Sequence, residues 1–378
     1  MKIVVAPDSF KGNLTALEVA NLIEKGIRRV YPKAKIVKTP MADGGEGTVR
    51  SLVDATKGRI IRKEVTGPLG KRVKASYGIL GDGKTAIIEM ASASGLPLVP
   101  KKKRNPLLTT TYGTGELIKA ALDRGCRKII VGIGGSATVD GGAGMAQALG
   151  AKLLDKRGRE ISFGGGALGN LEEISVSELD ERIKKTKVLV ASDVDNPLTG
   201  AKGAARVYAP QKGATPSMVK RLEKNLKRYA SIIKRDLKKD IKNVPGTGAA
   251  GGLGAGLIAF LDARIRLGVD IVIETIGLEK NLKDTDLVIT GEGKMDSQTI
   301  YGKTPIGVAK LAKKHNIPVV AIVGEVDEGV EVVYKHGIDG IMATTPYPMT
   351  STQAIKKSSQ LIPNASDRLM RLIKIRVD

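Results

Sequence analysis

The chain alternates short apolar runs with longer stretches of helical periodicity, and this alternation constrains its fold more than any other feature. The apolar runs are rich in Val and Ile and short, as buried strands usually are. They read "KIVVAPDS", "AKIVKTPMA", "KIIVGIGG", "KVLVASDV", "DLVITGEG", "PVVAIVGE" and "GIDGIMATT". Strands that alternate with helices predict parallel sheets with helices on their faces, so we expect an α/β fold built on a doubly wound sheet.

The segment between the second and third of these runs has a different pattern. It reads "RIIRKEVTGPLGKRVKASYGILGDGKTAIIEMA" and predicts consecutive antiparallel strands. A chain of 378 residues is also too long for one ordinary core. We therefore predict one domain built from both ends of the chain, residues 1–65 and 286–378, with a mixed α/β domain over residues 66–285 inserted into it.

The stretch from Gly78 to Thr85, "GILGDGKT", matches the phosphate-loop pattern G-x-x-x-x-G-K-[ST]. That pattern binds phosphate where a strand precedes the loop and a helix follows it, because the helix N-terminus supplies aligned N–H groups. Here strand-like residues lie on both sides, so we expect Gly81, Asp82 and Gly83 to form a hairpin turn. A nucleotide site should lie elsewhere.

The net charge of +23, from 62 Lys and Arg against 39 Asp and Glu, raises the question of a nucleic-acid partner. Much of the excess lies in "KKKR" and in "SMVKRLEKNLKRYASIIKRDLKKDIK", where apolar residues recur at helical spacing. Aromatic residues, which stack on bases, make up only 3% of the chain. A solvated amphipathic helix explains the charge better, and we expect no nucleic-acid partner.

The sequence also predicts a cytoplasmic protein without membrane contact. No apolar run reaches the length of a membrane span, and the opening "MKIVVAPDSF" has the pattern of a strand and a turn rather than of a signal peptide. Cys126 is the single cysteine, which rules out an internal disulfide and fits a reducing compartment. The sequence does not decide the oligomeric state, and a homodimer is one possibility.

Ligands of a doubly wound sheet bind beyond the carboxyl ends of its strands, and the loops there are polar in this chain. Three such loops follow strands of the domain built from both ends of the chain. Their candidate residues are Asp8, Ser9 and Lys11 in the first loop, Asp43, Gly44, Gly45 and Glu46 in the second, and Glu292, Lys294 and Asp296 in the third. We expect these carboxylate-bearing loops to converge on one edge of the sheet.

The inserted domain adds a glycine-rich loop between a strand and a helix, "IIVGIGGSATVDGGAGMAQALGA". Its candidate phosphate-binding residues are Gly134, Gly135, Ser136 and Thr138. The same loop satisfies G-x-G-x-x-A through Gly132, Gly134 and Ala137, which keeps a dinucleotide site open as an alternative.

Two further segments of the inserted domain complete the set of candidates. "ASDVDNPLTG" places Asp193 and Asp195 two residues apart after a strand, where alternate residues present their oxygens together, and "APQKGATP" supplies Lys212. For any single loop, a tight turn whose Asp caps a helix is an equally good explanation. Several such loops together favour a functional site.

This inventory suits phosphoryl transfer, which needs Mg²⁺ held by one or two carboxylates, N–H groups around phosphates, a basic residue and a base for the acceptor hydroxyl. The only two histidines lie outside every glycine-rich loop, which disfavours a His-dependent hydrolase or dehydrogenase. We expect Lys11 and Lys294 to offset the negative charge of the reaction, and Asp8 or Asp296 to receive the proton of the attacking hydroxyl. Asp193 is expected to hold Mg²⁺ together with Asp195.

Long blocks of the chain resemble, in order, the type I glycerate kinase family. The blocks are "APDSFKGNLTALEVA", "PMADGGEGTV", "EVTGPLG", "NPLLTTTYGTGELI", "GIGGSATVDGGAGMAQALGA", "DVDNPLTG", "PQKGATP", "GAAGGLGAGL" and "LVITGEGKMDSQTIYGKTPIGVAKLAK". They cover nearly the whole chain, and only the final stretch from "TPYPMTS" onward follows the pattern loosely.

The resemblance implies a flavodoxin-like domain with a second α/β domain inserted. It also implies ATP-dependent phosphorylation of D-glycerate with Mg²⁺, at the 2-hydroxyl in bacterial members. ATP and D-glycerate are then the expected small-molecule partners. Two other classes remain as alternatives: an NAD-dependent dehydrogenase of a small hydroxy acid, and a basic nucleic-acid-binding protein.

Overall fold

The computed structural model describes residues 1–375, and their contacts divide the chain into two compact units. The first, here called the terminal unit, combines Met1–Asp43, Arg50–Lys57 and the chain from Leu267 onward. The second, here called the inserted unit, contains Gly44–Val49 and Gly58–Arg266. The terminal unit is therefore made from both ends of the chain.

The division of the chain lies at other residues than the predicted 65/66 and 285/286. β3 (Arg59–Thr66) belongs to the inserted unit, because it pairs along its whole length with β4 (Arg72–Ile79). α9 (Gly268–Ile276) belongs to the terminal unit, where it packs against α11 (Thr304–Lys314). The sequence pattern marks strands and helices, but the partner of each element decides the unit to which it belongs.

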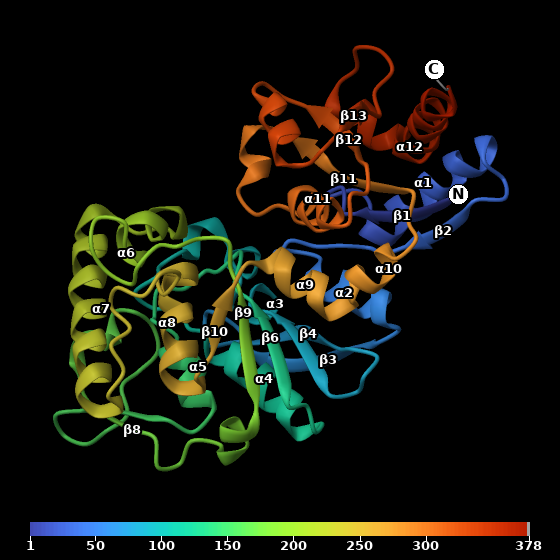
Figure 1. Ribbon diagram of the computed structural model, residues 1–378. Coiled ribbons are helices and arrows are strands. Elements are labelled where there is room, and N and C mark those ends of the chain that lie inside the picture. Colours follow the sequence, from blue (N-terminus) through green and yellow to red (C-terminus); the bar gives the residue numbers. More distant parts are fainter. Residues whose placement is uncertain (376–378) are drawn as a thin grey trace. The chain divides into compact units, whose positions relative to one another are not determined.

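The terminal unit is built on a five-stranded sheet in the order β13-β12-β11-β1-β2, and all of its strands are parallel. The strands are β1 (Lys2–Pro7), β2 (Lys35–Lys38), β11 (Leu287–Met295), β12 (Val319–Val326) and β13 (Gly340–Ala343). Figure 1 shows β1, from the start of the chain, beside β11. Counted along the chain the order is 2-1-3-4-5, which is the flavodoxin-like order and confirms the predicted fold class.

The helices of the terminal unit lie on both faces of this sheet. They are α1 (Ala16–Val30), most of α2 (Thr48–Thr56), α9, α10 (Leu278–Leu282), α11 and α12 (Ser351–Lys374), with the 3₁₀ turns η6 (Ser297–Ile300) and η7 (Val330–His336). α1 and α12 share a hydrophobic core with alternate residues of β1, including Ile3 and Val5. α11 packs on β11 and β12.

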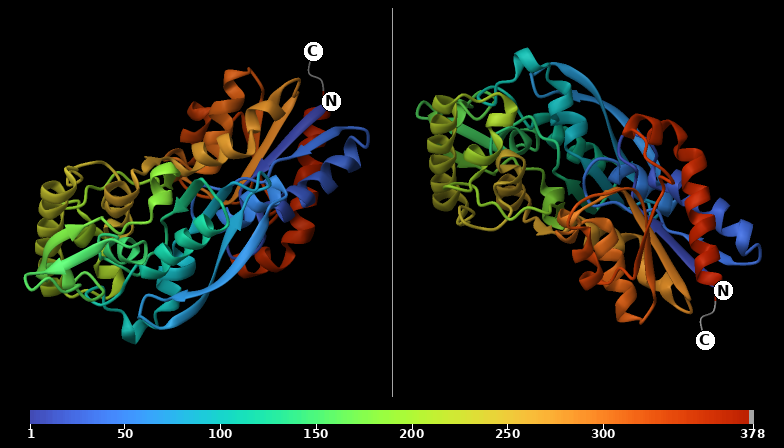
Figure 2. Two further views of the ribbon diagram at one scale, coloured as in Figure 1. Left: turned by 90° about the horizontal axis from the view of Figure 1, so that it is seen from below. Right: turned by 90° about the horizontal axis from the view of Figure 1, so that it is seen from above.

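Local sequence explains how α1 begins and why α12 can approach it. Thr15 Oγ1 accepts a hydrogen bond from Glu18 N, and Thr15 N donates to Glu18 Oε2 at 2.8 Å, so the first turn is closed by a capping box. At Gly26 a Cβ would lie 2.3 Å from the carbonyl oxygen of Pro363, so only glycine allows this close packing. Figure 2 shows α12, in red, beside the blue α1.

The inserted unit is built on a six-stranded mixed sheet in the order β10-β9-β6-β5-β4-β3. Its remaining strands are β5 (Thr85–Glu89), β6 (Lys128–Gly132), β9 (Lys187–Ala191) and β10 (Arg264–Arg266), and a separate hairpin is formed by β7 (Lys152–Asp155) and β8 (Leu171–Ser175). Neighbours among β10, β9, β6 and β5 are parallel, whereas β4 is antiparallel to both β5 and β3. The predicted antiparallel strands are confirmed.

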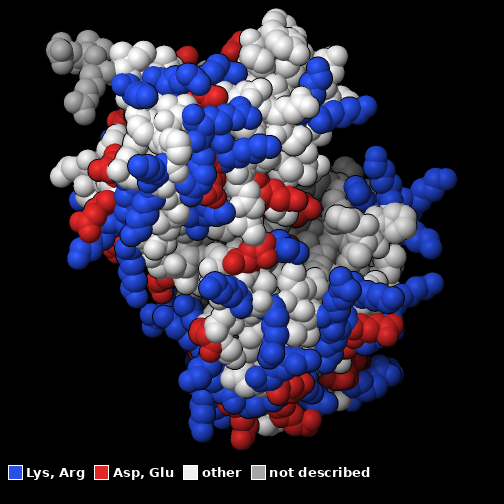
Figure 3. All heavy atoms as spheres, turned by 90° about the vertical axis from the view of Figure 1, so that its right-hand side faces the viewer, with Lys and Arg blue, Asp and Glu red and all other residues white. Residues whose placement is uncertain are grey.

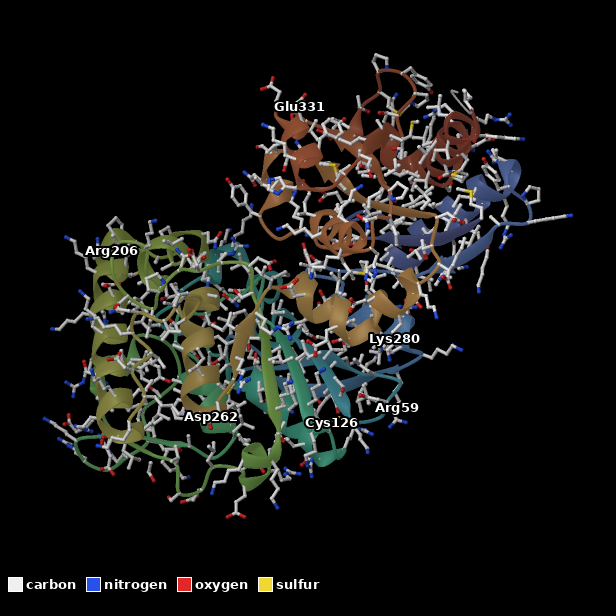
Figure 4. The ribbon with its side chains drawn as sticks, in the orientation of Figure 1. Arg59, Cys126, Arg206, Asp262, Lys280 and Glu331 are labelled. Carbon is white, nitrogen blue, oxygen red and sulfur yellow. The ribbon has the colours of Figure 1, made fainter. Side chains whose placement is uncertain are left out.

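Helices and 3₁₀ turns pack around this sheet. They are α3 (Ala91–Ser94), α4 (Tyr112–Asp123), α5 (Ala143–Ala148), α6 (Ala204–Tyr208), α7 (Pro216–Leu237), α8 (Ala249–Leu261), η1 (Leu96–Leu98), η2 (Lys101–Lys103), η3 (Ala167–Asn170), η4 (Glu181–Lys185) and η5 (Pro210–Lys212). Three residues labelled in Figure 4 locate these elements: Cys126 just before β6, Arg206 on α6 and Asp262 at the end of α8. Cys126 is buried and carries a free thiol.

The basic segment predicted to be an amphipathic helix is α7. Leu222, Leu226, Tyr229 and Ile233 are buried along one stripe, and the lysines and arginines between them are mostly exposed. On the face seen in Figure 3, basic side chains are spread widely with acidic ones among them. Among residues 1–375, no helix combines the length and the apolar character that a membrane span requires.

The "GILGDGKT" stretch forms the predicted hairpin between β4 and β5. Asp82 Oδ1 accepts hydrogen bonds from the backbone N–H groups of Lys84 and Thr85, both at 2.9 Å, so the aspartate side chain closes the turn on itself. A strand follows the turn, so no helix N-terminus is available here to bind phosphate.

We expect Lys84→Ala to leave nucleotide-dependent turnover within a few-fold of wild type, because Lys84 is exposed at a hairpin tip. Steady-state kinetics would measure this, with Lys71→Ala, at the preceding β3–β4 turn, as the matched control. A loss of roughly a hundredfold in Lys84→Ala alone, the size that follows removal of a charge-stabilising group, would show that this loop binds phosphate after all.

Candidate active site

A pocket of about 890 Å³ opens at the carboxyl ends of the strands of the terminal unit. Two of the predicted loops contribute to it, and of the third predicted loop only Asp296 follows its strand, because Glu292 and Lys294 lie on β11 itself. Its charged lining residues are Asp8, Lys11, Asp43, Glu292, Lys294, Asp296, Lys303 and Glu325. Asp8, Asp43, Glu292 and Asp296 are therefore brought to one edge of the sheet, whereas Glu46 belongs to the inserted unit and does not line this pocket.

Asp8 follows β1 directly and is buried at the base of this pocket. Ser9 N donates to its Oδ1 at 2.6 Å, and Thr304 Oγ1, from the first turn of α11, donates to its Oδ2 at 2.7 Å. Burial and the neighbouring carboxylate of Asp43 raise the pKa of Asp8 to about 6, against the opposing effect of these hydrogen bonds. Near neutral pH this carboxylate can accept a proton more readily than an ordinary aspartate.

Glu292 lies on β11, next to β1, and is only 9% exposed. Thr299 Oγ1 donates to its Oε1 at 2.8 Å, and Lys303 Nζ lies 3.5 Å from its Oε2. Burial raises the pKa of Glu292 to about 7, although Lys303 and Thr299 oppose this shift. At pH 7 the side chain is therefore protonated in a large share of the molecules, which lowers the negative charge of the pocket.

Asp296 caps the 3₁₀ turn η6 at the rim of the same pocket. Its Oδ1 accepts from Gln298 N at 2.9 Å and lies 3.3 Å from Lys303 Nζ. Asp296 therefore has the structural role of a helix cap, which was the alternative explanation for such loops. Asp8 caps no helix and is the more buried of the two candidate bases.

The two lysines chosen from the sequence have different surroundings. Lys11 Nζ lies 3.1 Å from Asp43 Oδ2; burial lowers its pKa, but the pKa is raised overall because Asp43 and Asp8 are negatively charged neighbours. Lys294 is paired across strands β11 and β12, at 3.3 Å from Glu325 and 2.7 Å from Asp327. The hydrogen bonds that Lys294 donates to these two carboxylates raise its pKa.

The sequence analysis missed Lys303, which lines the pocket, and Thr299 and Thr304, which donate hydrogen bonds to its carboxylates. Lys303 contacts both Glu292 and Asp296, so it neutralises more of the carboxylate cluster than Lys294 does. A signal was present in the stretch "DSQTIYGKTP", where polar residues lead into a helix that has a Pro in its first turn. Such residues cap many helices, so only their contacts reveal their place in the pocket.

The remaining predicted site residues belong to the inserted unit, where two glycine-rich loops lie close together. A Cβ at Gly132 would be 2.7 Å from Gly44 O, and one at Gly134 would be 3.9 Å from Gly45 Cα. Glu46 is exposed on the first of these loops. The second loop does not enter a helix directly, because α5 begins only at Ala143 and has six residues. This is a poor match to a dinucleotide fingerprint, whose last small residue opens a helix.

Lys212 is buried beneath the second glycine-rich loop instead of facing solvent. Its Nζ donates to Ser136 Oγ at 2.5 Å and to Thr138 O at 2.7 Å, while Gly134 and Gly135 are exposed. Burial lowers the pKa of Lys212 to about 7, and Asp140 acts in the opposite direction. Thr138 Oγ1 is also buried, without a hydrogen-bond partner among residues 1–375.

Asp193 and Asp195 lie in the exposed loop that follows β9. The neighbouring Asn196 holds this loop, since it accepts from Tyr208 OH at 2.6 Å and donates to Lys202 O at 2.8 Å. Within the described part of the chain, no group of three or more His, Cys, Asp or Glu is arranged to hold a metal ion. A site built on these two aspartates would supply no more than a pair of carboxylates.

Known proteins share this arrangement from end to end. The model of the glycerate kinase family matches residues 3–374. A glycerate kinase of Bacillus subtilis and a glycerate 2-kinase of Escherichia coli are each 54% identical over 375 residues, which is 99% of this chain and 98% of theirs. A crystal structure described as glycerate kinase 2 from Salmonella typhimurium LT2 superposes with a TM-score of 0.92 at 52% identity, covering 99% of this chain and 98% of that one.

These matches agree with the fold and extend over nearly the whole of the described chain. They confirm the resemblance that the sequence suggested: the chain belongs to the glycerate kinase family.

Proposed function

We propose that this protein transfers the terminal phosphoryl group of ATP to D-glycerate, at the 2-hydroxyl. One observation supports this most: the pocket of the terminal unit combines buried carboxylates of raised pKa, Asp8 and Glu292, with the amino groups of Lys11 and Lys303. Phosphoryl transfer depends on positioning and on neutralising charge rather than on covalent chemistry by the protein. The name of the Escherichia coli relative, glycerate 2-kinase, supports the choice of hydroxyl.

In this proposal the lysines offset the negative charge of the ligands, and Asp8 receives the proton of the attacking hydroxyl. Asp8 is preferred over Asp296, because the latter is engaged in capping η6 and in its pair with Lys303. Ser9 N and Thr304 Oγ1 hold the Asp8 carboxylate in place. Glu292, protonated in part at neutral pH, lowers the repulsion that anionic ligands meet.

The other predicted binding residues keep proposed roles within their own units. Ser9 and Asp43 line the pocket of the terminal unit. In the inserted unit, Gly44, Gly45, Glu46, Gly134, Gly135 and Ser136 are proposed to contact substrate or phosphate. Lys212 and Thr138 are buried, and we now propose that they support the loop from below.

Mg²⁺ fits the proposal as a partner of ATP, since this ion usually keeps several waters and binds through one or two carboxylates and the substrate phosphates. Asp193 and Asp195, both exposed after β9, are proposed to hold it. When bound, the ion would neutralise phosphate charge. A cytoplasmic location remains part of the proposal. Light scattering of the purified protein would test for the homodimer that the sequence leaves open.

The direct test is incubation of the purified protein with ATP, Mg²⁺ and D-glycerate. We expect ADP to form only when D-glycerate is present, and phosphorus NMR to identify 2-phosphoglycerate as the product. L-glycerate serves as the control substrate. Absence of glycerate-dependent ADP would overturn the proposed function, and 3-phosphoglycerate as the product would overturn only the choice of hydroxyl.

Asp8→Asn should lose most of kcat while KM is nearly unchanged, because only a base acts on the chemical step without binding ligand. Asp296→Asn is the matched control and should keep more of its kcat. In the wild type, kcat/KM should fall as the pH is lowered through about 6, where Asp8 becomes protonated. An equal loss in both variants would remove the reason for naming Asp8.

Asp8 should also affect stability in a predictable direction. Its pKa is raised in the folded protein, so its contribution is most favourable at low pH and is lost as the pH rises through about 6. When the pH is raised from 5 to 8, the melting temperature should therefore fall less for Asp8→Asn than for the wild type. A larger fall of the melting temperature in the variant would contradict the raised pKa of Asp8.

Lys11→Met and Lys303→Met should fold normally and lose roughly a hundredfold in kcat/KM, because each removes a positive charge from the pocket. Lys294→Met separates a direct role in the reaction from a structural role. A comparable loss of kcat/KM supports the direct role, whereas a near-normal kcat/KM indicates that Lys294 serves only its ion pairs with Glu325 and Asp327. If Lys11→Met and Lys303→Met both keep near-normal kcat/KM, the reaction does not take place in this pocket.

Asp195→Asn should raise the Mg²⁺ concentration needed for half-maximal activity and leave the melting temperature little changed, because Asp195 is exposed. Mg²⁺ titrations of activity and thermal unfolding measure the two quantities. Asp262→Asn, an exposed aspartate at the end of α8, is the control. A lowered melting temperature with an unaltered Mg²⁺ requirement would indicate a structural role instead.

A further inference from the structure

The pocket of the terminal unit has a second half whose residues have no role in the proposal above. It is formed where β12 and β13 end and α12 begins. Thr344, Thr345, Ser351 and Ser358 line it together with a set of apolar residues: Val326, Ala343, Tyr347, Met349, Ala354 and Ile355. We call this set the apolar half. The charged half, with Asp8, Lys11 and Lys303, belongs to the same pocket.

The apolar half exposes large side chains that a folded protein usually covers. Tyr347 is 56% exposed, Ile355 49% and Val326 41%. Exposed apolar residues scattered singly are ordinary, but a group of them on the wall of one pocket indicates a ligand that covers them.

The backbone on both sides of Tyr347 is restricted before any ligand arrives. Tyr347 lies between Pro346 and Pro348, whose rings restrict the backbone. Lys357 Nζ, one turn and a half into α12, donates to its hydroxyl at 3.4 Å. The loop is anchored after Tyr347 by the capping box that opens α12 at Thr350. A restricted backbone lowers the entropy that the loop loses when a flat group stacks on the ring.

The occupant of the apolar half must be flat, apolar on its faces and joined to a strongly anionic group, because the charged half supplies the lysines. Glycerate has three carbons, each bearing oxygen, and offers no apolar surface. A nucleoside triphosphate has both parts, and a pocket of about 890 Å³ is large enough for such a ligand. We propose that the apolar half binds the nucleobase of ATP, with the ring of Tyr347 stacked on the base and the phosphates directed to Lys11 and Lys303.

This inference rests on the proposed function, and its main test measures binding without turnover. The chain contains no tryptophan, so Tyr347→Trp introduces a single fluorescent reporter at the stacking position. ADP should quench its emission, whereas pyrophosphate, which lacks a base, should leave the emission nearly unchanged. Tyr334→Trp is the matched control, since Tyr334 is 48% exposed in the same unit but does not line the pocket.

Kinetics of the truncated side chain provide the second measurement. Tyr347→Ala should raise KM for ATP by about tenfold, within the range of one base–aromatic stack, while KM for glycerate and the melting temperature stay near wild type. Tyr347→Phe should restore the wild-type KM, and Tyr334→Ala should not change it.

Either measurement can overturn the inference. The base binds elsewhere if ADP and pyrophosphate quench Tyr347→Trp equally, or if neither quenches it. An unchanged KM for ATP in Tyr347→Ala leads to the same conclusion. The proposed function fails by a different result, namely wild-type protein that forms no glycerate-dependent ADP. ADP titrations would still report on the apolar half in that case.

Discussion

The parallel pairing of β1 with β11 is the interaction on which the pocket depends, because it joins the two ends of the chain. Ile3 to Pro7 pair with Leu287 to Gly291, and the register continues through a hydrogen bond of 2.8 Å from Asp8 N to Gly291 O. This register places Asp8 beside Glu292 at the carboxyl edge of the sheet. A shift of one residue would turn every side chain of β1 to the other face and would separate the two carboxylates.

Burying two carboxylates so close together is unfavourable, and the surrounding residues show how the fold tolerates it. Thr304 Oγ1 and Thr299 Oγ1 each donate to one of them, and Lys303 adds a positive charge. The compensation is incomplete, since the pKa values of Asp8 and Glu292 are still raised to about 6 and about 7. Incomplete compensation is typical of functional sites, where groups that exchange protons near neutral pH are needed.

Much of the charged pocket could be predicted, because a general rule relates strand ends to ligand sites. Asp8, Asp43 and Glu292 follow or end predicted strands, and they do line one pocket. Lys303 was not predicted, because the polar residues around it are of the kind that cap many helices and do not single out this lysine. Lys294 was chosen for its position after a strand, but its partner Glu325 comes from the neighbouring strand and was not foreseeable.

The sequence by itself determined the local structure: the strands and helices that alternate along the chain, the hairpin at "GILGDGKT" and the amphipathic character of α7. These features depend on the periodicity and the turn chemistry of neighbouring residues, which the sequence contains directly. Only the tertiary structure decided which unit includes β3, which lysine neutralises Glu292, and why Lys212 is buried while Asp195 is exposed. Burial and Coulomb interactions depend on distances between residues far apart in the chain, and those distances exist only once the strands have found their partners.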